Sequence, residues 1–423
     1  MTETLRLARG RCVGLLLALA TPWAAAGYFQ WDMVELPAAT GAACGDGSPY
    51  RFFVNRTPLS KDLVAVFEGG GACWDQNACL GIGPLSAANP NGIPPDYMQH
   101  LNNMAARGLV TPFSARTDPF QKVQTQSWNI VYLPYCTGDV HSGSKVTVYD
   151  DADPAHPRTQ YHRGQANIRA AAQWLRANLG QPTDMLLTGF SAGSVGSTVT
   201  YGIVRDALQP RGRASLIADS GLLMQAPRSG TPAQFPSLPL HEKIRAAWGL
   251  DEPGGLITWY AASLPGFDPD NLGSVNGALA NLYPQDRFTF LVFQADMNFS
   301  SFSYAKFYDD IANAPNDFVR RQNTLARWQP DLAMHAADLG PHANVSFHQA
   351  FFRNFNDSHC LTIVDFSATG IEELGIPSIA PVVDATLERG AATKNVEQDH
   401  VSDYFRPVSD VIRLFKLLTR WLG

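Results

Sequence analysis

The stretch Met185-Leu186-Leu187-Thr188-Gly189-Phe190-Ser191-Ala192-Gly193 places a serine between an apolar run and a helix-compatible segment, residues 194–208. This strand–turn–helix setting is that of a nucleophile elbow, in which a sharp turn presents the serine hydroxyl above the end of a sheet. The flanking glycines remove Cβ atoms that would collide with the strand and the helix. The pattern predicts Ser191 as a nucleophile. A glycine-rich turn without chemistry has the same letters, so the rest of the chain has to support this interpretation.

Strand-like runs recur along the chain, separated by stretches long enough for crossover connections. They are residues 63–67, 128–133, 185–188, 215–218, 288–293 and 345–351. A helix is predicted between two of them, because one helical face holds Ile168, Ala171, Ala172, Leu175 and Leu179, with Gly180 as the stop. The alternation predicts an α/β fold with a mostly parallel central sheet flanked by helices. Its ligand site is expected at the carboxyl ends of the strands.

Groups that a serine nucleophile needs follow three of these runs. The serine requires a base, a carboxylate that orients the base, and N–H donors for the oxyanion. Asp296 follows residues 288–293 and His359 follows residues 345–351, which gives the order serine, acid, histidine of the α/β-hydrolases. Residues 63–67 lead into Glu68-Gly69-Gly70-Gly71, a loop whose backbone N–H groups can face a substrate.

Each of these assignments has an alternative. Asp296 could merely cap a turn, and His359 could be an ordinary loop histidine. His400 is a rival base, because it precedes residues 408–422, whose apolar side chains recur at helical spacing and predict a last helix packed on the sheet. The order of the three groups after separate strands favours Asp296 and His359.

The first 26 residues have the features of a cleaved secretory signal. Arg6, Arg9 and Arg11 form a positive region, residues 13–20 form an apolar core, and Ala24-Ala25-Ala26 provides a cleavage site. The apolar core is too short to span a bilayer, and no later stretch is long and apolar enough. We therefore expect a secreted or periplasmic chain, 27–423, without a membrane span.

Length and charge narrow the class of protein further. The chain has 423 residues and a formal net charge of −6, which disfavours nucleic acid or an anionic membrane as a partner. Residues 27–423 are interpreted as a single catalytic domain, in which long insertions account for the size. Residues 222–283, rich in proline and aromatic residues, are expected to form a cap insertion over the site. The sequence does not define an oligomeric state.

The cysteines fit an oxidising compartment. Cys12 leaves with the signal, and an odd number of cysteines remains in the exported chain: Cys44, Cys73, Cys79, Cys136 and Cys360. The Cys73-x5-Cys79 spacing could belong to a metal clip, but no second cysteine pair or closely spaced histidines accompany it, so a disulfide is favoured. The acidic run Asp150-Asp151-Ala152-Asp153 is interpreted as a solvated turn rather than a calcium site. No metal or organic cofactor is expected.

Motifs over most of the exported chain resemble those of one family, the pectin acetylesterases of plants and bacteria together with the animal Notum carboxylesterases. The matching segments are Cys44-Gly45-Asp46-Gly47-Ser48, Glu68-Gly69-Gly70-Gly71-Ala72-Cys73 with Cys79, Pro134-Tyr135-Cys136 with Asp139 and Ser142-Gly143, Gly189 to Gly193, Asp219-Ser220-Gly221, Gln294 with Asp296, and His359-Cys360. They occur in the family's order with similar spacing. Ala72 departs from the pattern, because plant members tend to have tryptophan there, so a more open pocket wall is expected.

The resemblance implies an α/β-hydrolase-like esterase whose catalytic residues are Ser191 as nucleophile, Asp296 as orienting acid and His359 as base. It also implies an oxyanion hole built from the backbone N–H groups of Gly70, Gly71 and Ala192. With these motifs we predict the disulfides Cys73–Cys79 and Cys44–Cys136, which leave Cys360 without a cysteine partner.

These features predict a secreted serine esterase that removes O-acetyl or other short acyl groups, with an acylated carbohydrate such as pectin as its substrate. A lipid or polyester hydrolase with a deep acyl pocket is the alternative within enzymes. A catalytically idle carbohydrate-binding protein is the alternative from another class. The presence of a serine, an acid, a histidine and a donor loop in order favours the esterase.

Overall fold

The computed structural model describes residues 27–99, 110–118 and 121–398. The predicted secretory signal, the predicted last helix at 408–422 and His400 lie outside these ranges. Among the described residues, no helix has both the length and the apolar character that crossing a membrane requires.

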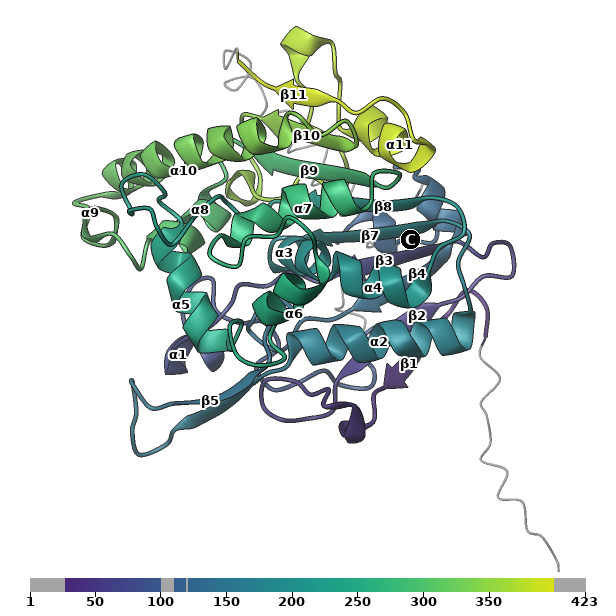
Figure 1. Ribbon diagram of the computed structural model, residues 1–423, viewed down its shortest axis with the longest axis horizontal. Coiled ribbons are helices and arrows are strands. Elements are labelled where there is room, and N and C mark those ends of the chain that lie inside the picture. Colours follow the sequence, from purple (N-terminus) through teal and green to yellow (C-terminus); the bar gives the residue numbers. More distant parts are fainter. Residues whose placement is uncertain (1–26, 100–109, 119–120, 399–423) are drawn as a thin grey trace, which may run out of the picture.

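A large mixed sheet runs through the molecule. Within the described ranges its strands lie in the order β1-β2-β4-β3-β7-β8-β9-β10-β11 (Figure 1). Their bounds are β1 (Trp31–Glu35), β2 (Arg51–Asn55), β3 (Leu63–Phe67), β4 (Asn129–Leu133), β7 (Met185–Phe190), β8 (Ala214–Asp219), β9 (Arg287–Phe293), β10 (Val345–Ala350) and β11 (Lys394–Val396). Strand β2 is antiparallel to β1 and β4, and every other neighbouring pair is parallel. The predicted mostly parallel sheet is confirmed.

Helices cover the sheet, and in Figure 1 α2, α4 and α6 are drawn in front of its strands. The helices of the described residues are α1 (Gln76–Cys79), α2 (Gly164–Leu179), α3 (Ala192–Val199), α4 (Tyr201–Leu208), α5 (Leu238–Trp248), α6 (Leu256–Ser263), α7 (Val275–Leu282), α8 (Met297–Tyr304), α9 (Asp309–Ala312), α10 (Asp317–Leu339) and α11 (Ala380–Glu388). Strands β3, β4, β8 and β10 are buried along their whole length, and β3, β4 and β8 are accordingly made mostly of apolar residues. Strand β10 also buries the polar side chains of Ser346, His348 and Gln349.

The predicted helix before β7 is α2. It buries Ile168, Ala171, Ala172 and Leu175, and it ends at Gly180, whose φ of 80° only glycine adopts readily. The helix-compatible segment after Ser191 consists of α3 and α4, which share Thr200 as a cap. Thr200 leaves helical geometry at this junction, with φ −107° and ψ 4°.

Several strands of the structure were not predicted. They are β1, β2, β11, and the separate antiparallel hairpin of β5 (Lys145–Tyr149) and β6 (Arg158–His162). Strand β1 lies at an edge of the sheet and is mostly exposed or half-buried, and β11 has only three residues. Such strands lack the continuous apolar run by which the central strands were recognised.

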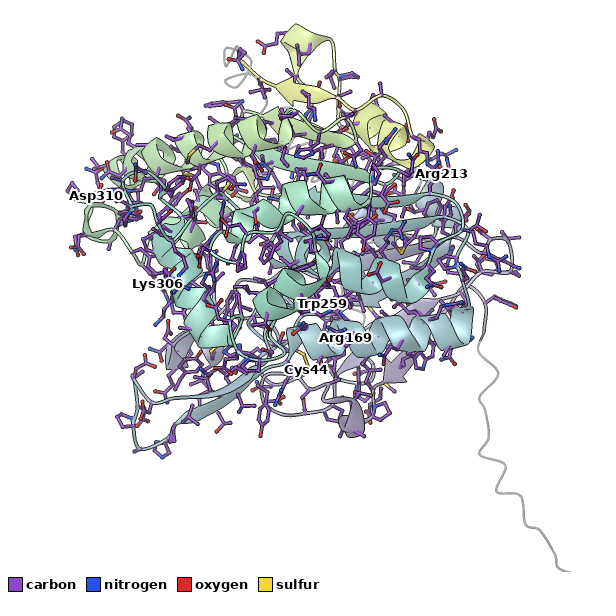
Figure 2. The ribbon with its side chains drawn as sticks, in the orientation of Figure 1. Cys44, Arg169, Arg213, Trp259, Lys306 and Asp310 are labelled. Carbon is purple, nitrogen blue, oxygen red and sulfur yellow. A yellow bond between two sulfur atoms is a disulfide. The ribbon has the colours of Figure 1, made fainter. Side chains whose placement is uncertain are left out.

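Residues 222–283 form an excursion between β8 and β9 that contains α5, α6 and α7. The Arg169 guanidinium of α2 lies 5.4 Å from the ring centre of Trp259 in α6, and Figure 2 shows the two side chains together. The Tyr260 hydroxyl donates to the Val199 carbonyl at the end of α3, at 2.7 Å. The excursion is therefore anchored on α2 and α3.

Two disulfides tie the loops near one end of the sheet. They join Cys44 to Cys136 and Cys73 to Cys79, with sequence separations of 92 and 6 residues, and Cys360 is a free buried cysteine. These are the pairs expected from the sequence. The short one lies directly after the glycine loop that follows β3, and the Trp248 indole N–H of α5 donates to the Cys73 carbonyl at 2.8 Å.

We expect the two disulfides to stabilise the fold unequally. A cross-link restricts the unfolded chain more when its loop is longer, so removal of Cys44–Cys136 should cost about 4–5 kcal/mol and removal of Cys73–Cys79 about 2 kcal/mol. Urea unfolding of the double variants C44S/C136S and C73S/C79S checks this order. An equal or larger loss for C73S/C79S would contradict it, and peptide mapping that finds Cys360 in a disulfide would contradict the pairing itself.

Candidate active site

Ser191 occupies a strained turn between β7 and α3. Its φ of 57° and ψ of −125° lie outside the regions that L-residues commonly adopt, and its N–H donates to the Asp219 carbonyl of β8 at 2.8 Å. The chain passes close behind the serine, since a Cβ on Gly193 would lie 2.1 Å from the Phe67 carbonyl oxygen. Glycine at 193 therefore permits the close packing of α3 on β3, and the turn has the geometry of a nucleophile elbow.

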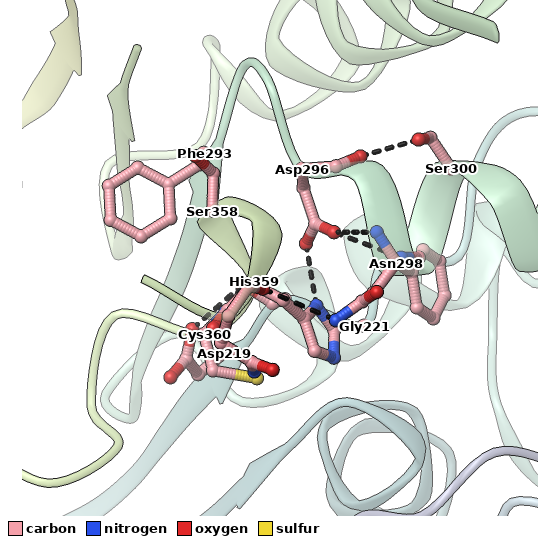
Figure 3. Close-up of polar contacts among 12 residues, drawn as sticks. Asp219, Gly221, Phe293, Asp296, Asn298, Ser300, Ser358, His359 and Cys360 are labelled. Atoms are coloured by element: carbon pink, nitrogen blue, oxygen red, sulfur yellow. Dashed lines mark hydrogen bonds and ion pairs between the residues drawn. The ribbon is translucent and has the colours of Figure 1, made fainter. Parts of the chain in front are cut away.

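Asp296 and His359 form a buried hydrogen-bonded pair in the segments that follow β9 and β10. The His359 Nδ1 lies 2.8 Å from Asp296 Oδ2, as Figure 3 shows. The other carboxylate oxygen accepts from the N–H groups of Asn298 and Phe299 at the start of α8, at 3.0 and 2.9 Å. Asp296 is completely buried, so these bonds fix the direction of its carboxylate.

The carboxylate sets the protonation of the imidazole. Burial alone lowers the pKa of His359, but the charge and hydrogen bond of Asp296 outweigh burial, and the pKa is raised from its ordinary value. A carboxylate accepts but does not donate, so in the neutral ring Nδ1 carries the proton and Nε2 is the basic nitrogen. The pair therefore has the orientation that a general base requires.

The loop after β3 supplies backbone N–H groups. Among the described residues, no recorded hydrogen bond uses the N–H of Gly70, Gly71 or Ala192 as its donor. Ala192 is the first residue of α3, where the helix itself leaves N–H groups without partners. Gly71 has a φ of 55°, and a Cβ there would lie 2.2 Å from the Ser86 carbonyl oxygen, so the loop requires glycine at this position.

One cavity brings these groups together. It has a volume of about 400 Å³, and Gly70, Gly71, Ser191, Ala192 and His359 all line it. Most of the remaining wall is apolar and comes from Leu85, Val110, Val140, Phe190, Phe299, Phe302 and Ile363. Asp296 lies behind His359 and is not part of the wall. The predicted site residues thus converge on a single space at the carboxyl ends of the strands.

A second cavity of about 540 Å³ adjoins the first. The two share Leu85, Asn298 and Phe302 as lining residues. The second also has a charged side made by Lys306, Asp317, Arg320, Arg321 and Asp357, and Ala72, the position that departs from the plant pattern, lines it. No residue of 222–283 is among the lining residues of either cavity, and the role of this excursion as a cap stays a prediction.

Glu68 is a site residue whose role the sequence did not reveal. Its carboxylate accepts from the hydroxyls of Tyr97 and Tyr132 at 2.6 and 2.9 Å and from the Tyr135 N–H at 2.9 Å. Burial raises the pKa of Glu68 in spite of these bonds. The carboxylate ties the end of β3 to the segment after β4. The feature of the sequence that could have indicated this role is the position of Glu68 directly before three glycines.

The described residues contain one cluster of possible metal ligands. Cys73, Cys79 and His162 are the group whose ligand atoms lie near one another, within 4.8 Å. The two sulfur atoms form a disulfide and are not thiolates. The ring nitrogens of His162 contact the Tyr149 hydroxyl and the Thr137 carbonyl at 3.0 and 3.1 Å. The three residues are therefore close together because of the disulfide and the packing of His162 beside it, and they do not form a set of metal ligands.

The fold and the site define the class of protein: an α/β hydrolase with a candidate Ser–His–Asp triad. A family profile described as Pectinacetylesterase matches residues 24–238, about half of the chain. The chain belongs to the pectinacetylesterase family.

Curated relatives lie in both branches of this family. Over 224 residues the chain is 25% identical to the palmitoleoyl-protein carboxylesterase NOTUM of Drosophila melanogaster, a match that covers 50% of this chain and 30% of the relative. Over 204 residues it is 26% identical to pectin acetylesterase 5 of Arabidopsis thaliana, covering 46% of this chain and 44% of the relative. The match spans less than half of the length of either relative.

A solved structure shares the fold. The crystal structure of the Wnt deacylase Notum from Drosophila superposes with a TM-score of 0.54 at 19% identity, and the match covers 87% of this chain and 96% of that chain. The α/β-hydrolase fold predicted from the sequence is thereby confirmed.

We expect Asp296 to control the protonation of His359. In the Asp296→Asn variant the carboxylate charge is lost while burial remains, so the pKa of His359 should fall relative to the wild type. An NMR titration of the labelled imidazole measures the change. Asp357→Asn is the control, because Asp357 lies in the same loop as His359 but its carboxylate contacts Arg321. An unchanged pKa in Asp296→Asn would contradict the assignment.

Proposed function

We propose that this chain is a serine carboxylesterase that acts through an acyl-enzyme. The observation that carries the proposal is that one cavity is lined by a strained serine, by the histidine of an Asp–His pair and by three N–H groups that have no acceptor among the described residues. Its membership of the pectinacetylesterase family supports the same chemistry, since the curated relatives are named as carboxylesterases and acetylesterases.

Each group has a defined task in the proposed reaction. The Ser191 hydroxyl attacks the ester carbonyl carbon and gives its proton to Nε2 of His359. The N–H groups of Gly70, Gly71 and Ala192 bind the oxyanion of the tetrahedral intermediate. When the intermediate collapses, the protonated His359 returns the proton to the alkoxide, which leaves as the alcohol. Water, deprotonated by His359, then attacks the acyl-enzyme carbonyl carbon. As the second intermediate collapses, His359 returns this proton to Ser191 Oγ, which releases the acid and free Ser191.

For the substrate we propose short O-acyl groups carried by a polysaccharide such as pectin. The cavity of about 400 Å³ is at the small end of ligand sites and must hold the acyl group together with the first atoms of the alcohol. The adjoining cavity has an aromatic side with Trp74 and a charged side with Arg320 and Arg321, which suits a polyhydroxylated alcohol better than a fatty chain.

A lipid or polyester hydrolase is the second candidate. The apolar wall of the first cavity, which includes Phe190, Phe299 and Phe302, supports it, because apolar surface favours longer acyl groups. The same family includes relatives named for a palmitoleoyl ester. The acyl preference has to separate these two candidates.

Export is part of the proposal. The disulfides Cys44–Cys136 and Cys73–Cys79 fit an oxidising compartment such as the extracellular space or the periplasm. The signal-like pattern of residues 1–26 supports the same location.

Ser191→Ala should abolish ester hydrolysis while the fold is retained. Loss of the nucleophile is expected to lower kcat by about 10⁴-fold or more, as in other hydrolase triads. Hydrolysis of 4-nitrophenyl acetate and thermal unfolding measure the two properties. Ser263→Ala is the matched control, because Ser263 lies exposed at the end of α6, where its hydroxyl donates to the Trp259 carbonyl. Turnover by Ser191→Ala at the level of this control would refute the proposal.

The two candidate bases should behave differently. His359→Ala is expected to be nearly inactive, because Ser191 then has no proton acceptor. His400→Ala is expected to retain most activity. The same assay measures both variants. A reversed result would identify His400 as the base and exclude the proposed role of His359.

Acyl length should distinguish the two candidate substrates. We expect kcat/KM for 4-nitrophenyl esters to be highest from acetate to butyrate and to fall at about eight carbons or more, because the small cavity would leave the additional methylenes in water. Steady-state kinetics from acetate to palmitate measure the preference. A rise towards the long chains, at about 0.8 kcal/mol for each buried methylene, would instead favour the lipid or polyester hydrolase.

A further inference from the structure

A buried carboxylate, Asp219, lies between the elements that carry the proposed catalytic residues. Asp219 is the last residue of β8, next to the elbow strand β7, and it is completely buried. Neither of its carboxylate oxygens takes part in the proposed chemistry. Such a group is costly to bury unless hydrogen bonds compensate for lost water, so its partners indicate what it does.

The carboxylate holds the loop that follows His359. Three consecutive N–H groups after His359 point to Asp219 and its neighbour Ser220. The Leu361 N–H donates to one carboxylate oxygen at 2.8 Å and the Thr362 N–H to the other at 2.7 Å. The Cys360 N–H donates to the Ser220 hydroxyl at 3.0 Å, and this hydroxyl donates to Asp219.

The same short segment also holds the other two catalytic elements. The Asp219 carbonyl accepts the N–H of Ser191, and the Ser220 N–H donates to the Leu291 carbonyl of β9, the strand that leads to Asp296. The next residue, Gly221, accepts a hydrogen bond from the Ser194 hydroxyl of α3 at 2.8 Å. A single segment of three residues thus contacts the nucleophile turn, the acid strand and the histidine loop.

We propose that Asp219 is a positioning residue that sets the placement of His359 relative to Ser191. The inference rests on the proposed function above. The carbonyl of Asp219 fixes the nucleophile turn, and its carboxylate fixes the histidine loop, so the base and the nucleophile are held by the same residue. The His359 loop needs this restraint, because Asn356, Asp357 and Ser358 all have positive φ values and Cys360 does too.

Asp219→Asn tests the inference with little change in volume. Both carboxylate oxygens accept from backbone N–H groups, and in the variant an NH2 group replaces one of these oxygens. In either orientation of the amide, this NH2 faces a backbone N–H, so two donors oppose each other and one hydrogen bond is lost. Displacement of the histidine should lower kcat by about 10²-fold while KM changes by less than about threefold, since Asp219 itself does not line the substrate cavity.

The titration of His359 gives a second readout that a merely structural role would not move. His359 faces the carboxylates of Asp296 and Asp219, which raise its pKa, and the Arg353 guanidinium, which lowers it, as burial does. Loss of the Asp219 charge should therefore lower the pKa of His359. The acid limb of the profile of kcat/KM against pH, where the base becomes protonated, should move to lower pH.

Asp331→Asn is the matched control. Asp331 is a fully buried carboxylate of α10 that accepts from the hydroxyls of Ser237 and Tyr304, at 2.6 and 2.7 Å, and neither partner belongs to the histidine loop. This variant should lose thermal stability to a similar degree, with kcat and the pKa of His359 unchanged. Equal effects of Asp219→Asn and Asp331→Asn on kcat would overturn the inference.

A second pair of variants covers failure of Asp219→Asn to fold. The Thr362 hydroxyl donates to Asp219 at 2.6 Å, so Thr362→Val removes one restraint on the loop and Thr362→Ser retains it. We expect Thr362→Val to lower kcat several-fold and Thr362→Ser to restore it. Equal kcat values for both variants and the wild type would overturn the inference.

The outcomes separate this inference from the proposed function. If the wild type hydrolyses no ester, the proposed function fails, while the titration of His359 in the Asp219 variant still measures the coupling between the two residues. If the wild type is active and Asp219→Asn retains its kcat, KM and His359 pKa, the positioning role fails alone.

Discussion

The parallel register of β3, β7 and β8 is the constraint on which the site depends. Phe67 pairs with Gly189, and Gly189 pairs with Ala218, so the three strands end at the same level. The residues that follow therefore meet at one edge: the glycine loop after β3, Ser191 after β7 and the carboxylate at the end of β8. Strands β9 and β10 continue the pattern and bring in Asp296 and His359. The register of the strands alone therefore places the site residues at one edge of the sheet.

The site also buries several ionisable groups. Asp219 and Asp296 are completely buried and His359 is 7% exposed, and each has hydrogen-bond partners that fix its direction. Glu68 is held in the same way by two tyrosine hydroxyls. Because the polar groups of such a network already have fixed directions, little free energy is spent on reorienting them when charge develops nearby. A site that stabilises an oxyanion requires such preorganised groups. We therefore interpret the buried carboxylates as supports of the reacting groups rather than as contributions to stability.

The sequence predicted the centre of the fold and the order of the candidate residues, because both follow from local patterns. Five of the six predicted strands are mainly apolar runs, and Ser191, Asp296 and His359 follow three of the six, at one, three and nine residues beyond Phe190, Phe293 and Ala350. The edge strand β1 and the short β11 lack such runs and were missed. Asp219 was quoted only as part of a motif, since its partners Leu361 and Thr362 are 142 and 143 positions away. The placement of 222–283 depends on packing against α2 and α3, which no local pattern encodes.

The central claim is that Ser191 becomes covalently modified while His359 is its base. Labelling of the purified protein with a fluorophosphonate, followed by peptide mass spectrometry, tests it most directly, because the reagent reacts with activated serines and requires no knowledge of the natural ester. The account predicts one phosphonylated residue, Ser191, with labelling strongly slowed in the His359→Ala variant. Labelling of another serine, or equally fast labelling of Ser191 without His359, would contradict it.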